Sequence, residues 1–146
     1  MKEKLFATKS SLTFFILRLS LGIVIWPHGY QKITGFSKVM HHLVNDYQLP
    51  WLIAFFVVLI EFVTPLLLLV GFASRIMAVL LAVVMIGAIP YHWDNGFFMN
   101  WFGNQAGEGF EYHLLAIGIA TAIVLEGGGK YSLDRKILNK SQKVLA

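Results

Sequence analysis

A single carboxylate lies near the middle of an apolar stretch that is long enough to cross a lipid bilayer. Glu61 is the only formally charged residue in the 21-residue stretch from Pro50 to Val70. An acidic group at the centre of a membrane helix costs roughly 2.5–3.5 kcal/mol on insertion scales, so it needs a partner or a task. Arg18, inside the first apolar run, is a second such charge. Together they could position charge or pass protons, which makes both candidate catalytic residues.

The depths of these two charges predict that they meet. Arg18 lies six residues past the inner end of the first apolar run, about 9 Å deep, and Glu61 nine residues from the inner end of the second, about 13 Å deep. Their side chains span this difference, and pairing would spare each charge an isolated place in lipid. We therefore expect an Arg18–Glu61 ion pair, which either only fixes the helix register or also takes part in function.

Further polar side chains gather near the outer ends of the predicted helices. His28, Gln31 and Lys32 have the spacing i, i+3 and i+4, so they share one helix face. Other polar residues flank the last outer connection: His92, Asp94, Glu108, Glu111 and His113. Each histidine is either an interfacial hydrogen-bonding residue or part of a site. As a group they could orient a quinone carbonyl, with His28 also a catalytic candidate, relay protons, or bind a metal. No metal-motif spacing is present, so we predict no metal site.

Prolines and aromatic residues mark the same end. Pro27, Pro65 and Pro90 cannot donate to the carbonyl four residues earlier, and a freed carbonyl in a bilayer needs protein or water beside it. This predicts a cavity in the outer half, unless neighbouring side chains fill the gaps. Aromatic residues at this end form either an interfacial belt or, with the glycine-containing connection 93–110, a lid over that cavity.

These residues must be positioned by apolar segments of nearly bilayer length, about 20 residues for a helix. We predict helices over residues 12–33, 50–70, 74–92 and 111–126, with a tail helix over 132–140 that is capped by Ser132. The short turn 71–75 makes the second and third helices antiparallel neighbours, whereas 34–49 and 93–110 are longer outer connections. The fold class is therefore all-α: residues 1–146 form one domain, an integral membrane antiparallel four-helix bundle with a short C-terminal amphipathic helix.

The composition fits a membrane protein. Hydrophobic residues make up 57% of the 146 residues and charged residues 14%, too few polar groups to cover a water-soluble globule. The first apolar run is longer than a signal peptide requires and contains Arg18, so we expect it to be retained. The chain has no cysteine, which excludes thiol–disulfide exchange, iron–sulfur ligation and covalent c-type haem attachment.

The positive charges predict the orientation in the membrane. With both termini in the cytoplasm, nine Lys and Arg residues lie on that side and only Lys32 and Lys38 on the outer side. The nine are Lys2, Lys4, Lys9, Arg75, Lys130, Arg135, Lys136, Lys140 and Lys143. The net charge of +4 is then a topology signal with attraction to anionic lipid, and nucleic acid is not implied.

Four strings resemble the DoxX family of small bacterial membrane proteins. They are LRLSLGIVIWPHGYQKITGF (17–36), the second-helix glutamate followed by GFASR (71–75), HWDNGFFMNWFGNQAGEGFEYHLL (92–115) and GGGKYSLDR (127–135). The matching positions are Arg18, Gly22, His28, Gly29, Gln31, Lys32, Glu61, Gly107, Glu108 and Glu111. The resemblance implies a four-helix protein of the bacterial inner membrane, similar to the small subunit of an archaeal thiosulfate:quinone oxidoreductase. It also implies links to oxidative stress and to soluble redox enzymes as partners.

Our first hypothesis is a membrane subunit of a quinone-linked oxidoreductase or redox-stress system. A quinone would enter between the helices, with His28 or Glu111 on its carbonyls and Gln31, Lys32, His92 and His113 around it. The alternative is a non-catalytic scaffold or small-amphiphile carrier that docks peripheral enzymes through the basic tail. A proton-coupled transporter is a second alternative, and it would need a homo-oligomer to build a path.

Overall fold

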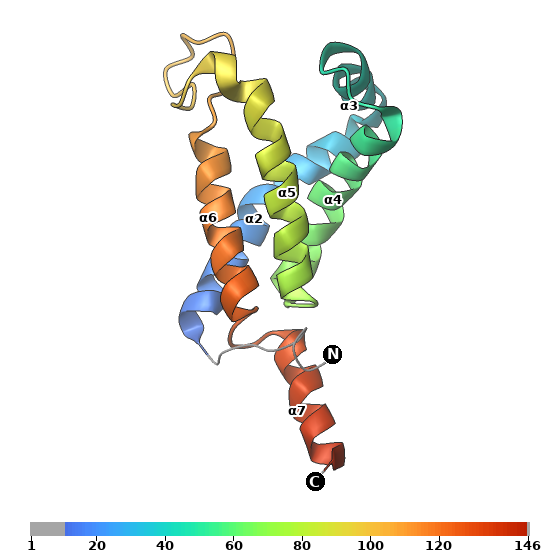
Figure 1. The fold of residues 1–146 in the computed structure, drawn as a ribbon, viewed down its shortest axis with the longest axis vertical. Coiled ribbons are helices and arrows are strands. Elements are labelled where there is room, and N and C mark those ends of the chain that lie inside the picture. The colour runs from blue at the N-terminus through green and yellow to red at the C-terminus, as the bar shows by residue number, and fades with distance from the viewer. Residues whose placement is uncertain (1–10, 146) are drawn as a thin grey trace.

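The computed structural model describes residues 11–145, with side chains described as far as residue 140, and every regular element in that range is helical (Figure 1). The elements are α2 (Leu12–Thr34), α3 (Phe36–His41), the π-helical η1 (His42–Asp46), α4 (Trp51–Val70), α5 (Ser74–His92), the 3-10 helix η2 (Trp93–Asn95), α6 (Glu111–Glu126) and α7 (Leu133–Leu145). The four long helices agree with the prediction to within one residue at each end. Lys2, Lys4 and Lys9, used in the charge count, lie outside the described residues, as does the side chain of Lys143.

Three of the described helices are long and apolar enough to cross a membrane: α2, α4, and α5 continued through η2. The 16 residues of α6 fall short of the roughly 20 that a full crossing takes. Large apolar side chains face outward on these helices, among them Leu52 at 59% and Val83 at 61% exposed. An outer surface of this kind is stable in lipid and not in water, so the chain is a membrane protein.

The helices pack as α2 against α4 and α5 against α6, with further contacts between α4 and α5 and between α2 and α6. One end carries α3, η1 and the connection 93–110, and we call it the loop end; the other carries α7, and we call it the tail end (Figure 1). Toward the loop end, α2 and α4 lean away from α6 (Figure 1). Side chains of both groups therefore face a shared space there.

Two glycines set the register between α2 and α4. A Cβ on Gly29 would overlap the backbone carbonyl of Glu61 and come within 2.7 Å of the Phe62 Cα. A Cβ on Gly22 would lie 3.1 Å from the Pro65 carbonyl oxygen. Small residues of this kind allow two membrane helices to approach backbone to backbone. Gly29 therefore lies level with Glu61, and Gly22 lies level with the following turns of α4.

This register keeps Arg18 away from Glu61, so the expected ion pair between them is wrong. Arg18 precedes Gly29 by 11 residues, which is about 16 Å along a helix axis. The guanidinium instead lies beside Gly71, where an added Cβ would be 3.0 Å from its central carbon, and Glu61 pairs with Lys32. The depth estimate assumed that the start of α2 and the end of α4 lie at one level, whereas α2 begins several residues beyond the end of α4.

Arg18 serves the tail end of the structure. Its side chain is 1% exposed and donates to the carbonyls of Leu68, Leu69 (2.6 Å) and Gly128 (2.9 Å). The last carbonyls of a helix have no partner within the helix, and cations favour its C-terminal end. Arg18 thus caps α4 from α2 and ties both helices to the segment that leads into α7.

Asp134 makes the complementary contact at the start of α5. Its carboxylate accepts from the backbone N–H groups of Ala73 (2.6 Å) and Ser74 (2.9 Å), and the residue is 2% exposed. Ser132 caps α7 by accepting from the Arg135 N–H at 3.3 Å, which confirms its predicted role. The tail helix was predicted over 132–140; it begins one residue later, at Leu133, and runs to Leu145, five residues past the predicted end. Figure 1 shows α7 leading away from the other helices.

We predict that Gly29→Ala destabilises the protein, because the added methyl group overlaps the backbone of α4 and backbone cannot swing aside. Gly118→Ala in α6 is the matched control, since a Cβ there meets nothing within 4 Å. It should be neutral or gain up to about 1 kcal/mol from helix propensity. Thermal unfolding of the detergent-purified variants measures the difference. Equal midpoints for the two variants would contradict the proposed close approach.

We predict that Arg18→Met lowers the free energy of unfolding by about 2–4 kcal/mol. The substitution leaves buried carbonyls without a donor, and hydrogen bonds to charged groups contribute about 1.5–3 kcal/mol each. Lys136→Met, at an exposed position of α7, is the control and should change stability by less than about 0.5 kcal/mol. A melting midpoint for Arg18→Met close to that of Lys136→Met would show that the cap contributes little.

Candidate functional site

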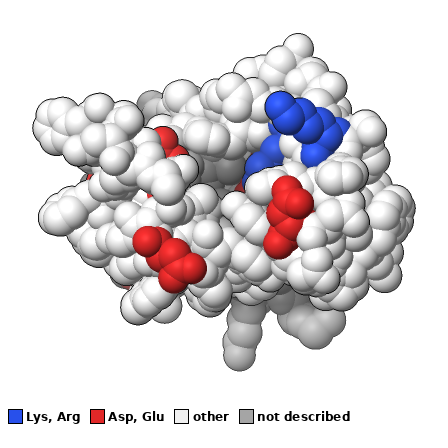
Figure 2. Space-filling view, turned by 90° about the horizontal axis from the view of Figure 1, so that it is seen from above, with Lys and Arg blue, Asp and Glu red and all other residues white. Residues whose placement is uncertain are grey.

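The loop end contains a cavity of about 790 Å³. Seen from above, this end is hollowed, and basic and acidic side chains stand at the margin of the hollow (Figure 2). Titratable side chains from α2, α3, η1, α4, α5 and α6 line it, with Glu108 from the connection before α6. They are His28, Lys32, Lys38, His41, His42, Asp46, Tyr47, Glu61, His92, Glu108, Tyr112 and His113. The helices therefore bring polar residues from distant parts of the sequence to one place.

Glu61 and Lys32 form an ion pair across α4 and α2 at this cavity. Lys32 lies one turn from Gly29, the residue level with Glu61, so its long side chain reaches the carboxylate. The Glu61 side chain is 7% exposed and that of Lys32 is 30% exposed, so the pair faces the cavity from its wall. A carboxylate held in this way can keep a charge, or accept and return a proton, at a depth where lipid alone would disfavour it.

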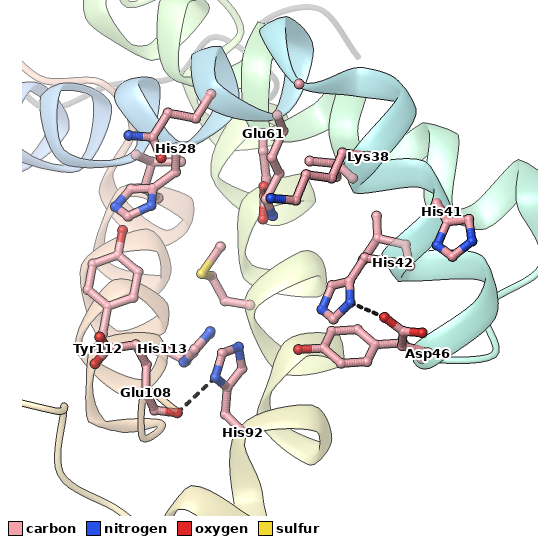
Figure 3. A pocket seen from close by; sticks show the side chains of 18 of the residues that line it. His28, Lys38, His41, His42, Asp46, Glu61, His92, Glu108, Tyr112 and His113 are labelled. Atoms are coloured by element: carbon pink, nitrogen blue, oxygen red, sulfur yellow. Dashed lines mark hydrogen bonds and ion pairs between the residues drawn. The ribbon is translucent and has the colours of Figure 1, made fainter. Parts of the chain in front are cut away.

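A pair of histidines forms another wall. The rings of His92 and His113 lie 4.5 Å apart, and Figure 3 shows them side by side from α5 and α6. His92 Nδ1 lies 2.9 Å from the backbone carbonyl of Glu108, which holds that ring in place. His113 is 8% exposed, and its Nδ1 has no hydrogen-bond partner within the described part of the chain. Buried polar atoms are normally satisfied, so the unpaired nitrogen of this cavity-lining residue is an exception that calls for a partner.

The polar face predicted on α2 lies as expected. His28, Gln31 and Lys32 all line the cavity, which confirms that the i, i+3, i+4 spacing brings them together. His28 is exposed at the open side, and its ring is 5.9 Å from that of Tyr112 on α6. An aromatic ring, an imidazole and an amide are thus presented from two facing helices, a set that suits a flat ligand with hydrogen-bonding oxygens.

Two predicted site residues lie elsewhere. The Glu111 carboxylate does not line the cavity; it accepts from the Met99 backbone N–H (3.0 Å) and from the Trp101 indole N–H (2.9 Å). It therefore organises the connection 93–110. Arg18 lies at the tail end, in the cap described above, and makes no contribution to the cavity.

Sequence reasoning missed the contribution of residues 36–47, which it treated as part of a connection. Here α3 and η1 place His42 and Asp46 on the cavity, with the His42 Nδ1 and an Asp46 carboxylate oxygen 2.5 Å apart. A signal was present, because apolar residues recur at helical spacing. They are Phe36, Val39, Met40, Leu43 and Tyr47, and they pack on the loop-end half of α4.

The aromatic residues of the connection 93–110 fit a belt better than a lid. Phe98, Trp101 and Phe102 are 64%, 76% and 91% exposed, and none of them lines the cavity. From this connection the cavity takes only Met99 and Glu108. Rings that point outward at the end of membrane helices are typical of an interfacial belt.

Comparison with known proteins agrees with this arrangement. Residues 13–101 match the model of the DoxX family. The chain belongs to the DoxX family. The matched range runs from α2 through α5 and contains Lys32, Glu61 and His92, whereas His113 follows it.

One relative of this DoxX-family chain is a Bacillus subtilis protein named "Putative oxidoreductase CatD". It is 34% identical over 74 residues, which make up 51% of this chain and 54% of the relative. The chain thus spans about half the length of that protein. No solved structure matches the chain.

We predict that Lys32 and Glu61 are energetically coupled. Removing either charge alone, by Lys32→Met or Glu61→Gln, leaves the other poorly compensated, whereas the double variant removes both. A double-mutant cycle on unfolding free energy should give a coupling of about 1–3 kcal/mol. The partial exposure of Lys32 keeps this below the cost of breaking a fully buried pair. Additive single-variant effects would show that the contact contributes no stability.

Proposed function

We propose that the loop-end cavity binds a quinone or a similar flat amphiphile, and that the protein is a membrane subunit of a quinone-linked redox system. The observation that carries this proposal is buried His113, which lines a cavity shared with the Glu61–Lys32 pair and whose Nδ1 has no hydrogen-bond partner among the described residues. The volume of about 790 Å³ lies within the range of small-molecule sites. Donors on opposite walls suit a ring with carbonyl oxygens on both sides.

Different residues of the cavity would bind the quinone ring and exchange protons with it. A bound quinone would supply the capacity to accept or return electrons. Tyr112 and His113 of α6 on one wall and His28 of α2 on the other would hydrogen-bond its oxygens and orient the ring. Glu61, held by Lys32, would keep or transfer a proton beside the ring. His28, which is exposed, would be the route by which protons reach the cavity.

Electrons would come from a partner protein. The chain has no cysteine, and the described residues hold no group of His, Asp and Glu that could bind a metal ion. We propose a soluble redox enzyme as that partner, docked near the basic helix α7 at the tail end. The family and the name of the Bacillus subtilis relative both support an oxidoreductase system.

We propose that α6 completes a four-helix bundle in a bacterial inner membrane, with both termini in the cytoplasm. Its packing along α5 and its contact with α2 support this arrangement. The connection before it, with exposed aromatic rings, would extend the crossing into the interface. The loop end would then face outward, where the charge count leaves few positive residues.

A non-catalytic carrier of small amphiphiles is the second candidate. It is favoured by the same cavity and by the absence of cysteine, since a carrier needs a site and no redox group. Saturable quinone binding without any quinone reduction in native membranes, and without a redox enzyme in the purified complex, would select it.

We predict that the purified protein binds menadione, a quinone ring without a chain, and that His113→Leu weakens this binding about three- to tenfold. One hydrogen bond of about 1 kcal/mol accounts for that range. Leucine also removes a buried polar atom without a partner, so the melting temperature should stay level or rise. Tryptophan fluorescence quenching and thermal unfolding measure the two quantities.

The matched control is His41→Leu, an exposed histidine at the edge of the cavity in Figure 3, to which the proposed ring contacts assign no role. It should leave binding unchanged. Absence of saturable menadione binding by the unmodified protein would overturn the proposed function. Equal losses in both histidine variants would remove His113 from the site.

A further inference from the structure

A second hollow opens between α4 and α5 on the side of the molecule. It has a volume of about 360 Å³, and apolar side chains of both helices form its walls. We call it the α4–α5 cleft. Ile53, Phe56 and Ile60 line it from α4, and Val83 and Gly87 line it from α5. Between helices in lipid, such a cleft suits hydrocarbon and not a polar group.

The cleft adjoins the loop-end cavity. Five residues line both hollows, namely Lys32, Leu43, Tyr47, Glu61 and His92. The Glu61–Lys32 pair therefore stands where polar walls give way to apolar ones. One molecule with a polar head and an apolar chain would match this change along its own length, whereas two separate ligands would meet at the ion pair.

The cleft also faces lipid along its length. Ile53, Phe56 and Val83 are 51%, 48% and 61% exposed, and they lie on helices long and apolar enough to cross a membrane. Near the loop end, Tyr47 and Tyr91 stack with ring centres 4.6 Å apart and join η1 to α5. A chain in the cleft would thus pass below this stack and continue directly into the bilayer.

We propose that the α4–α5 cleft holds the hydrocarbon chain of a prenyl-chain quinone whose ring lies in the loop-end cavity. This inference rests on the proposed function and adds the route by which the ligand enters and the class of ligand selected. Lipid is as apolar as the cleft, so burying the chain contributes affinity mainly through close packing. The main consequence is steric: a chained quinone needs the cleft open, and a chainless ring does not.

Gly87 offers a direct way to close the cleft. It lies within α5, and a Cβ built on it meets nothing within 4 Å, so a side chain can start there without overlapping the backbone of a neighbouring helix. Gly118 in α6 is a matched control, because it is also an exposed helical glycine with open space around its Cβ and does not line the cleft. Both substitutions gain similar helix propensity.

The test compares menadione with menaquinone-4, which has the same ring and a prenyl chain, on protein in phosphatidylcholine nanodiscs. Gly87→Phe should weaken menaquinone-4 binding about tenfold or more and leave menadione binding unchanged. Gly118→Phe should change neither affinity. Val83→Trp, one turn from Gly87 toward the tail end, should reproduce the effect from a second position. Retained menadione binding shows that the variants are folded.

Three results overturn the inference in distinguishable ways. If Gly87→Phe leaves menaquinone-4 binding unchanged, the chain does not use the cleft, although the cavity remains the ring site. If Gly87→Phe weakens both ligands equally, the substitution acts on the cavity and not on a chain route. If the unmodified protein binds neither ligand, the proposed function fails, and the inference fails with it.

Discussion

The structure depends on one constraint: a charge or an unpaired backbone group in a bilayer must find its partner inside the protein. Arg18 and Glu61 satisfy this constraint at opposite ends. Arg18 caps the final carbonyls of α4 and holds the segment that leads into α7, so its charge is used for architecture. Glu61 is held by one lysine at the wall of a cavity, so its charge remains next to whatever enters. Of the two, only Glu61 is placed for chemistry.

Backbone approach decides which charges meet. Gly29 brings α2 against the Glu61 carbonyl, and Gly22 extends the contact toward the end of α4. Lys32 then lies one turn beyond Gly29, within reach of Glu61, while Arg18 is left level with the last turn of α4. At the tail end, two charged side chains cap helix ends: Asp134 of α7 accepts hydrogen bonds from the backbone at the start of α5, and Arg18 of α2 donates to the carbonyls at the end of α4. The tail end is thereby held by fixed contacts, whereas the large polar cavity lies at the loop end.

The loop-end cavity and the adjoining α4–α5 cleft are best interpreted together. A polar cavity alone would suit many small solutes, and an apolar cleft alone would be filled by lipid. Side by side at the Glu61–Lys32 pair, they match the proposed ligand, which is polar and flat at one end and apolar at the other. The unpartnered Nδ1 of His113 indicates where such a head would accept or donate a hydrogen bond. This combination supports the redox role that we propose for this DoxX-family chain.

The sequence by itself determined the helices, because the length of an apolar run and its flanking glycines and prolines are local properties; all four long helices were placed to within one residue. It also determined the face of His28, Gln31 and Lys32, since spacing on one helix needs no partner. Only the tertiary structure decided that Glu61 pairs with Lys32 and not Arg18, because that depends on where two helices touch. The same holds for Glu111, because its hydrogen-bond partners lie in a connection without a periodic sequence pattern. It also holds for His113, because only the packed structure shows that its Nδ1 has no hydrogen-bond partner among the described residues.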